Sequence, residues 1–154
     1  MTLLDAKEYD PAPSRRRWKI IGLVAAVLVV ALVLWRIYRF WPEEHAINRF
    51  FEAIEAKNYD EAYGIYFADP NWKHHPDRYK YGVNQFILDW GPGSEYGAIT
   101  THHIDCSLEP PAKGYDSSGV VVVVTINRIA ESKSMWVEKG SRTITTSPIT
   151  VSCQ

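Results

Sequence analysis

The feature that most constrains this chain is an uncharged run near the N-terminus, residues 20–35 (IIGLVAAVLVVALVLW). As a helix, these sixteen residues cover about 24 Å of a hydrocarbon core that is about 30 Å thick. Aromatic and basic side chains at both ends suit the membrane–water interface and lengthen the span: Trp18, Lys19, Trp35, Arg36, Tyr38, Arg39 and Trp41. The pattern predicts a single transmembrane helix over residues 20–41.

Two other interpretations of this run are weaker. A cleaved signal peptide needs small residues at its cleavage site, whereas residues 35–41 (WRIYRFW) are bulky and basic. A buried core helix that is apolar on every face needs more surrounding protein than the remaining residues provide. We therefore expect a retained signal-anchor.

Basic residues near the two ends of the span predict its orientation. Five precede it (Lys7, Arg15, Arg16, Arg17 and Lys19) and three follow it (Arg36, Arg39 and Arg49). The bias places residues 1–19 in the cytoplasm as a short tail and residues 43–154 outside it as a periplasmic domain. We expect a single-pass protein of the cell inner membrane, with the lipid bilayer as its first partner.

Helical patterns fill the first half of this domain. Pro42 and two glutamates signal a helix start, and Asp60 is a candidate cap for a second helix. A third helix ends at Gly91. Apolar residues recur at helical spacing in these three segments: Ile47, Phe50, Phe51, Ile54, Tyr63, Tyr66, Val83, Phe86, Ile87 and Trp90.

After Gly93, the spacing of apolar residues changes from the 3.6-residue period of a helix to the two-residue period of a strand. In residues 102–108, alternation puts His102, Ile104 and Cys106 on one strand face. Five consecutive valines in residues 120–129 predict a strand covered on both faces. Residues 135–139 with 143–146 form its expected antiparallel partner, and residues 149–153 alternate as a final edge strand.

The order of helices and strands resembles the nuclear transport factor 2-like fold. Residues 50–63 (FFEAIEAKNYDEAY) resemble the opening helix pair of that family, and residues 85–96 (QFILDWGPGSEY) its third helix and entry to the sheet. The resemblance covers residues 43–146. It implies an α+β fold in which about three helices pack on a curved antiparallel sheet to form a cone. The family includes ketosteroid isomerases, polyketide cyclases, non-catalytic binding proteins and membrane-anchored assembly parts, so the fold alone does not select a function.

The resemblance does not extend to a catalytic set. The isomerases of the family hold a Tyr and two acidic groups inside the cone, and the valine-rich strand offers no acid before Glu131. Asp89 is an acid near the expected cone mouth, but an Asp at a helix end is usually solvated. We therefore predict no catalytic residue. Five side chains are candidates to line a cone cavity: Tyr63, Tyr66, Trp90, His102 and Trp136.

Histidines and cysteines give weaker signals. His102 and His103 face opposite sides of a strand and do not chelate one ion, so we expect no metal and no cofactor. An extracytoplasmic location permits a disulfide between Cys106 and Cys153, but sequence does not show whether their Cα atoms lie within about 7 Å. The net charge of −1 does not favour nucleic acid as a partner.

Two functional hypotheses follow. The favoured one is a non-enzymatic binding or assembly module held at the membrane, which forms a homodimer or contacts other membrane proteins. The alternative is a small-molecule-binding protein or an isomerase- or cyclase-like enzyme that uses the cone cavity. An open pocket with convergent polar groups would distinguish them.

Overall fold

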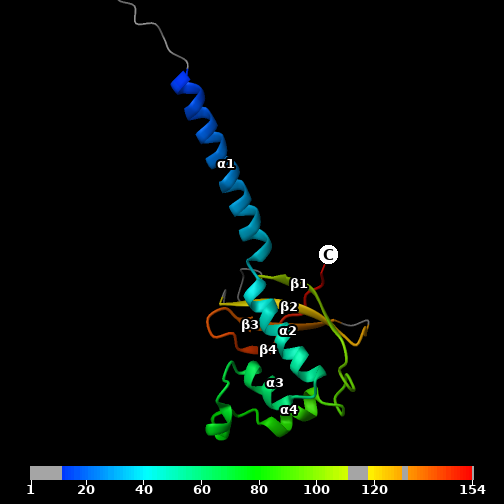
Figure 1. The fold of residues 1–154 in the computed structure, drawn as a ribbon. Coiled ribbons are helices and arrows are strands. Elements are labelled where there is room, and N and C mark those ends of the chain that lie inside the picture. Colours follow the sequence, from blue (N-terminus) through cyan, green and yellow to red (C-terminus); the bar gives the residue numbers. More distant parts are fainter. Residues whose placement is uncertain (1–11, 111–117, 130–131, 154) are drawn as a thin grey trace, which may run out of the picture. The chain divides into compact units, whose positions relative to one another are not determined.

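The computed structural model describes residues 12–110, 118–129 and 132–153. It divides the chain into two compact units, Met1–Arg39 and Phe40–Gln154. Figure 1 shows their elements in chain order. The first unit holds one helix, and the second holds helices that pack against a four-stranded antiparallel sheet. The predicted α+β class is therefore confirmed.

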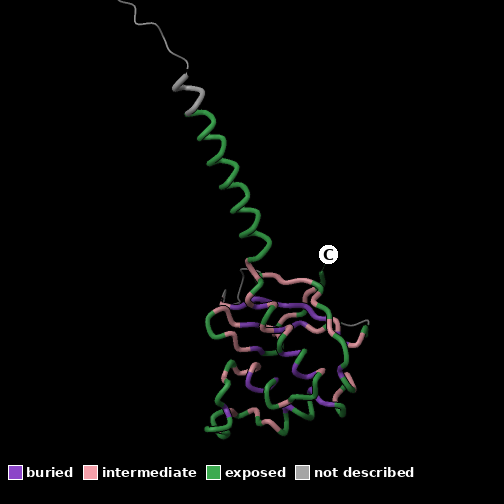
Figure 2. The backbone as a smooth tube through the Cα atoms, viewed as in Figure 1, coloured by how far each residue is buried: buried purple, intermediate pink, exposed green. Residues whose placement is uncertain are grey.

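Helix α1 (Ala12–Tyr38) contains the uncharged run. Every residue from Arg17 to Tyr38 is exposed, as the colouring of Figure 2 shows. The helix is long and apolar enough to cross a membrane, a property that membrane anchors and signal sequences share. Trp41, the last residue of the expected span, is the first residue of the next helix.

Three α-helices belong to the second unit: α2 (Trp41–Glu55), α3 (Tyr59–Tyr66) and α4 (Val83–Trp90). Short 3₁₀ turns η1 (Trp72–His74) and η2 (Pro76–Arg78) lie between the last two. The expected cap of the second helix was wrong. Asn58 caps α3 instead, because its side-chain oxygen accepts the backbone N–H of Glu61 at 3.3 Å.

The sheet has the order β1 (His102–Leu108), β2 (Gly119–Ile126), β3 (Lys133–Glu138) and β4 (Ile144–Thr146). The predicted edge strand over residues 149–153 is wrong, since the segment forms no strand. Its Val151 N–H instead donates to Ser134 Oγ at 3.5 Å. A side-chain bond of this kind holds the segment without the ladder of backbone bonds that defines a strand.

A register shift in β1 corrects the predicted strand face. Ile104 pairs with Val124, but Cys106 pairs with Val123, so Asp105 is an extra residue in β1. A one-residue insertion moves the following side chains to the other face of a sheet. Cys106 therefore does not share the face of His102 and Ile104, because the alternation that predicted it holds only without a bulge.

The helices cover one face of the sheet. Val120, Val122 and Val124 belong to the buried core together with residues of α2, α3 and α4. Figure 2 shows the buried segments of the second unit. Other members of the core cluster are Ile47, Phe50, Phe51, Ala53, Ile54, Ala62, Tyr63, Trp72, Phe86, Trp90, Ile99, Ile126, Met135, Val137 and Ile144. Aromatic edge-to-face contacts link them, such as Phe50 with Trp90 at 5.1 Å.

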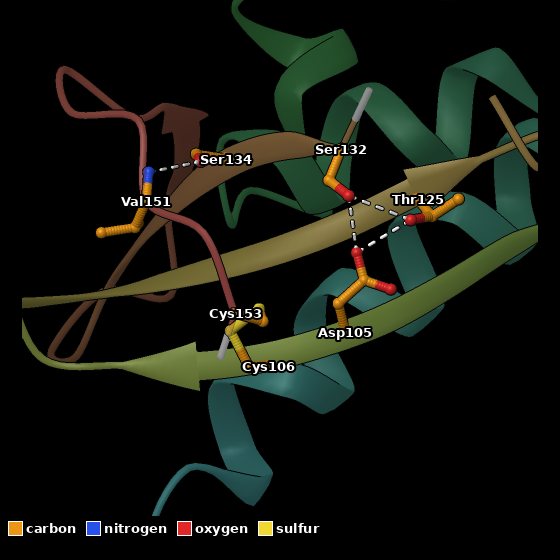
Figure 3. The surroundings of a disulfide bond; sticks show 7 residues. All are labelled: Asp105, Cys106, Thr125, Ser132, Ser134, Val151 and Cys153. Carbon is orange, nitrogen blue, oxygen red and sulfur yellow. Dashed lines mark hydrogen bonds between the residues drawn. A yellow bond between two sulfur atoms is a disulfide. The ribbon is translucent and has the colours of Figure 1, made fainter. Parts of the chain in front are cut away.

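The C-terminal segment crosses the opposite face of the sheet. A disulfide joins Cys153 to Cys106 of β1, with Cα atoms 5.9 Å apart (Figure 3). The Val151 N–H donates a hydrogen bond to Ser134 Oγ of β3. Strand β2 lies between β1 and β3, so the segment passes over its outward-facing valines. Val123 is buried and lines the same hollow as Val151 and Cys153. The valine strand is thus covered on both faces, as its composition predicts.

Candidate binding pocket

A cavity of about 480 Å³ opens in the second unit beside the C-terminal end of α4. The end of α3, the segment before α4, the turn after α4, and strands β3 and β4 contribute to its wall. Aromatic and charged side chains supply most of the lining: Tyr66, Tyr81, Asp89, Trp90, Glu95, Tyr96 and Lys133. The size falls within the range of small-molecule sites, roughly 300–1,000 Å³.

Aromatic rings form a large part of the wall. Trp90 is the last residue of α4, is 5% exposed, and stacks on Tyr96 with 6.0 Å between ring centroids. Tyr66 is the last residue of α3, and its ring centroid lies 5.8 Å from that of Tyr81. Because both helices end here, their terminal aromatic side chains meet at one cavity.

Asp89 places a carboxylate at the rim. The Tyr81 hydroxyl donates to its Oδ2 at 2.7 Å, and Gln85, one helical turn earlier, donates to its Oδ1 at 2.8 Å. Burial raises the pKa of the Tyr81 hydroxyl, and the hydrogen bond to Asp89 raises it further. Burial, followed by the charge of Asp89, also raises the pKa of Tyr66. Both phenols therefore stay protonated at neutral pH, and Tyr81 donates its O–H to Asp89.

A second charged group lies beside Tyr96. Lys133 Nζ is 3.7 Å from Glu95 Oε1 and 5.7 Å from the centroid of the Tyr96 ring. Hydrogen bonding to Tyr96 is the largest effect that raises the pKa of Lys133, and it is also the largest that lowers the pKa of Glu95. At neutral pH this pair therefore consists of an ammonium and a carboxylate.

The structure brings two of the five predicted lining residues together. Tyr66 and Trp90 both line the pocket. Tyr63 lies in the adjacent core, 1% exposed, and its hydroxyl donates to the backbone oxygen of Tyr81 at 2.7 Å. It therefore supports the segment that carries Tyr81 and does not itself line the cavity.

The other two predicted residues lie elsewhere. His102 Nδ1 is 2.7 Å from Glu55 and Nε2 is 3.0 Å from Asn48, and the ring stacks on Phe51. This histidine ties β1 to α2. Trp136 pairs with Val121 and so lies on the sheet face opposite the helices.

A larger hollow of about 830 Å³ lies between α2 and α3, lined by residues such as Trp41, Ala46 and Ile65. Its lysine and arginine side chains already have acidic partners. Lys73 pairs with Asp60, Arg49 lies 3.7 Å from Glu61, and Arg142 pairs with the buried Glu43. Because its charges are matched internally, this hollow offers a ligand less electrostatic specificity than the pocket beside α4.

Sequence reasoning missed most of the polar lining of the pocket. Tyr81, Glu95 and Lys133 come from two connecting segments and a strand, and no motif links them. One signal was present, since Gln85 and Asp89 are spaced to share the exposed side of α4. Asp89 was expected near the cone mouth but was given no role, because an Asp at a helix end is usually solvated.

Within the described ranges, no group of three or more His, Cys, Asp or Glu residues is arranged to hold a metal ion. The pocket itself is lined by neither histidine nor cysteine among the residues that the structure describes. Its polar groups are phenols, carboxylates, one ammonium, the Trp90 indole and the hydroxyls of Ser94 and Thr146. Comparison of the chain with protein-family models, with curated proteins and with solved structures gave no match.

Proposed function

We propose that this chain is a single-pass membrane protein whose second unit is an extracytoplasmic binding or assembly module. The observation that carries the proposal is α1, in which all residues from Arg17 to Tyr38 are exposed. Residues 20–35 include eleven Ile, Leu and Val side chains. Burial of each is worth roughly 1.5 kcal/mol or more, so a lipid environment stabilises this helix by more than a typical net folding free energy.

A retained anchor explains the helix better than a cleaved signal. The run is followed directly by Arg36, Tyr38 and Trp41, and a cleavage site needs small residues. The same aromatic and basic residues suit the interface at the end of a span.

The disulfide supports an extracytoplasmic second unit. Cys106 and Cys153 are bonded, and structural disulfides persist in oxidising compartments. The excess of Lys and Arg before the span also favours a cytoplasmic N-terminus. In a bacterium, this topology corresponds to an inner-membrane protein with a periplasmic domain.

We assign the domain to the nuclear transport factor 2-like fold as part of the proposal. Its helices precede four antiparallel strands, which is the element order of that family. A binding role fits a domain in which the pocket has hydrogen-bonding groups but no histidine or cysteine among its described lining residues. Partners in the membrane, including a second copy of the chain, suit the assembly role.

Alkaline carbonate washing of membranes tests the anchor. The intact chain should remain in the pellet, and protease added outside the inner membrane should digest the second unit. Replacement of Leu28 and Leu32 by arginine should release the protein, since each Arg at the centre of a span costs about 2.5–3.5 kcal/mol. The matched double alanine variant should stay in the membrane. An intact wild-type chain in the carbonate supernatant would refute the proposal.

Crosslinking in native membranes tests the assembly role separately. We expect the full-length chain to give crosslinked species larger than the monomer. Recovery of monomer alone, at several crosslinker lengths, would contradict assembly while leaving the anchor intact.

A second candidate function, small-molecule binding, is favoured by the pocket beside α4. Asp89 and Tyr81 converge there on a cavity of suitable size. The cavity gives this candidate a specific location in the domain.

A further inference from the structure

The charges that line the pocket beside α4 do not balance. Asp89 and Glu95 are carboxylates and Lys133 is an ammonium, so the lining carries one excess negative charge. Lys133 lies 3.7 Å from Glu95 and offsets that charge. Asp89 receives hydrogen bonds from Tyr81 and Gln85, which are neutral donors. Among the described residues, none places a cationic group within ion-pair distance of Asp89.

Asp89 also acts electrostatically on two neighbouring side chains. Its negative charge raises the pKa of Tyr66 and opposes the lowering of the pKa of Glu95. The Asp89 side chain is exposed at the rim of the cavity, where its negative charge is accessible to a ligand. A cationic ligand would be attracted to it.

The rings around Asp89 provide the second element of cation recognition. Tyr66, Tyr81, Trp90 and Tyr96 line the same cavity. Aromatic faces carry a negative quadrupole that attracts ammonium groups within about 6 Å of a ring centroid. The chain already shows such a contact, because Lys133 Nζ is 5.7 Å from the Tyr96 centroid.

We propose that this pocket binds a small organic cation, an amine or quaternary ammonium compound, with its charged group between Asp89 and the aromatic rings. The inference rests on the proposed binding function and names its ligand class. The cavity of about 480 Å³ accommodates a molecule of a few carbon atoms around the charged nitrogen. A bare divalent cation is a poorer match, because it requires six or more oxygen ligands and aromatic faces supply none.

The test uses the purified full-length chain in a non-ionic maltoside detergent, free of choline lipids. Choline and its neutral carbon isostere, 3,3-dimethylbutan-1-ol, are titrated by calorimetry. The two probes have almost the same shape and differ in charge. We expect choline to bind and the neutral isostere to bind at least tenfold more weakly. Equal affinity of the two, or no binding of choline, would overturn the proposal.

Two matched substitutions identify the site. Asp89→Asn should weaken choline binding by about tenfold or more, because it removes the charge that faces the ligand. Asp77→Asn removes the same charge from an exposed position in η2, outside the pocket, and should leave the affinity unchanged. Equal affinity of the Asp89 variant and the wild type, or an equal loss in both variants, would place binding elsewhere and overturn the assignment.

Salt dependence provides a measurement that needs no variant. Choline affinity of the wild type should fall as sodium chloride rises from 50 to 500 mM, because screening weakens the attraction to Asp89. An affinity that does not respond to salt contradicts the proposed contact. The same preparations are checked by carbonate extraction of their source membranes. A chain that stays anchored but does not bind choline refutes this inference alone.

Discussion

Removal of the disulfide between Cys106 and Cys153 tests how the C-terminal segment is held. The bond closes a loop with a sequence separation of 47, for which the chain-entropy relation gives about 4 kcal/mol. Typical measured losses are about 2–4 kcal/mol. The loss is large beside a typical folding free energy of about 5–15 kcal/mol.

Serine at both positions removes the bond with little change in size. With a urea m-value of about 2 kcal/mol per molar, the expected loss lowers the unfolding midpoint by about 1–2 M. Tryptophan fluorescence of the full-length chain in detergent monitors the transition, since Trp72 and Trp90 are buried in the second unit. Release of the segment should also expose Val123, which it covers in the folded state.

Reduction of the wild type provides the control. Dithiothreitol should lower the wild-type midpoint to that of the double serine variant and should leave the variant unchanged. Mass spectrometry confirms that the thiols are free. An unchanged midpoint in fully reduced wild type would refute the reasoning, because it would show that the segment holds its place without the covalent link.

Two further predictions concern the sheet and the loop after α3. Gly119→Ala should lower the free energy of unfolding by about 1–3 kcal/mol, because a Cβ there would overlap the indole of Trp136, whereas Gly140→Ala, which has open space, should be neutral in the same urea titration. Equal midpoints for the two variants would contradict the overlap. The hydrogen bond from Tyr79 is the largest effect that lowers the pKa of Asp69. A lowered folded-state pKa stabilises the protein above the unfolded pKa of about 3.9, and this stabilisation is lost as pH falls through the folded value. The midpoint difference between wild type and Asp69→Asn should therefore be present at pH 7 and shrink below about pH 4; a difference independent of pH would argue against an ionised Asp69.

Much of the local structure could be predicted because its signals lie within short segments. The positions of Phe86 and Trp90 repeat at helical spacing, and the glycine after them ends the helix. The run of valines identified β2 because β-branched residues favour strands and an unbroken apolar run requires cover on both faces.

The candidate pocket could be predicted only in part. Tyr66 and Trp90, which we expected to line a cone cavity, both line the pocket beside α4. His102 was expected beside them, but its ring nitrogens instead form hydrogen bonds with Glu55 and Asn48 of α2. Partners that far apart in the sequence are selected by packing, and no local pattern encodes them.

The sequence by itself determined that one apolar helix precedes a domain of helices followed by strands, because hydrophobic period and run length are properties of neighbouring residues. Only the tertiary structure decided which face of β1 carries Cys106, because the extra residue Asp105 is visible only when β1 is aligned with β2. The tertiary structure also decided the charge balance of the pocket. Lys133 forms an ion pair with Glu95, and among the described residues no cation pairs with Asp89. Such pairings form when strands and helices pack, and they depend on distances that a linear sequence does not contain.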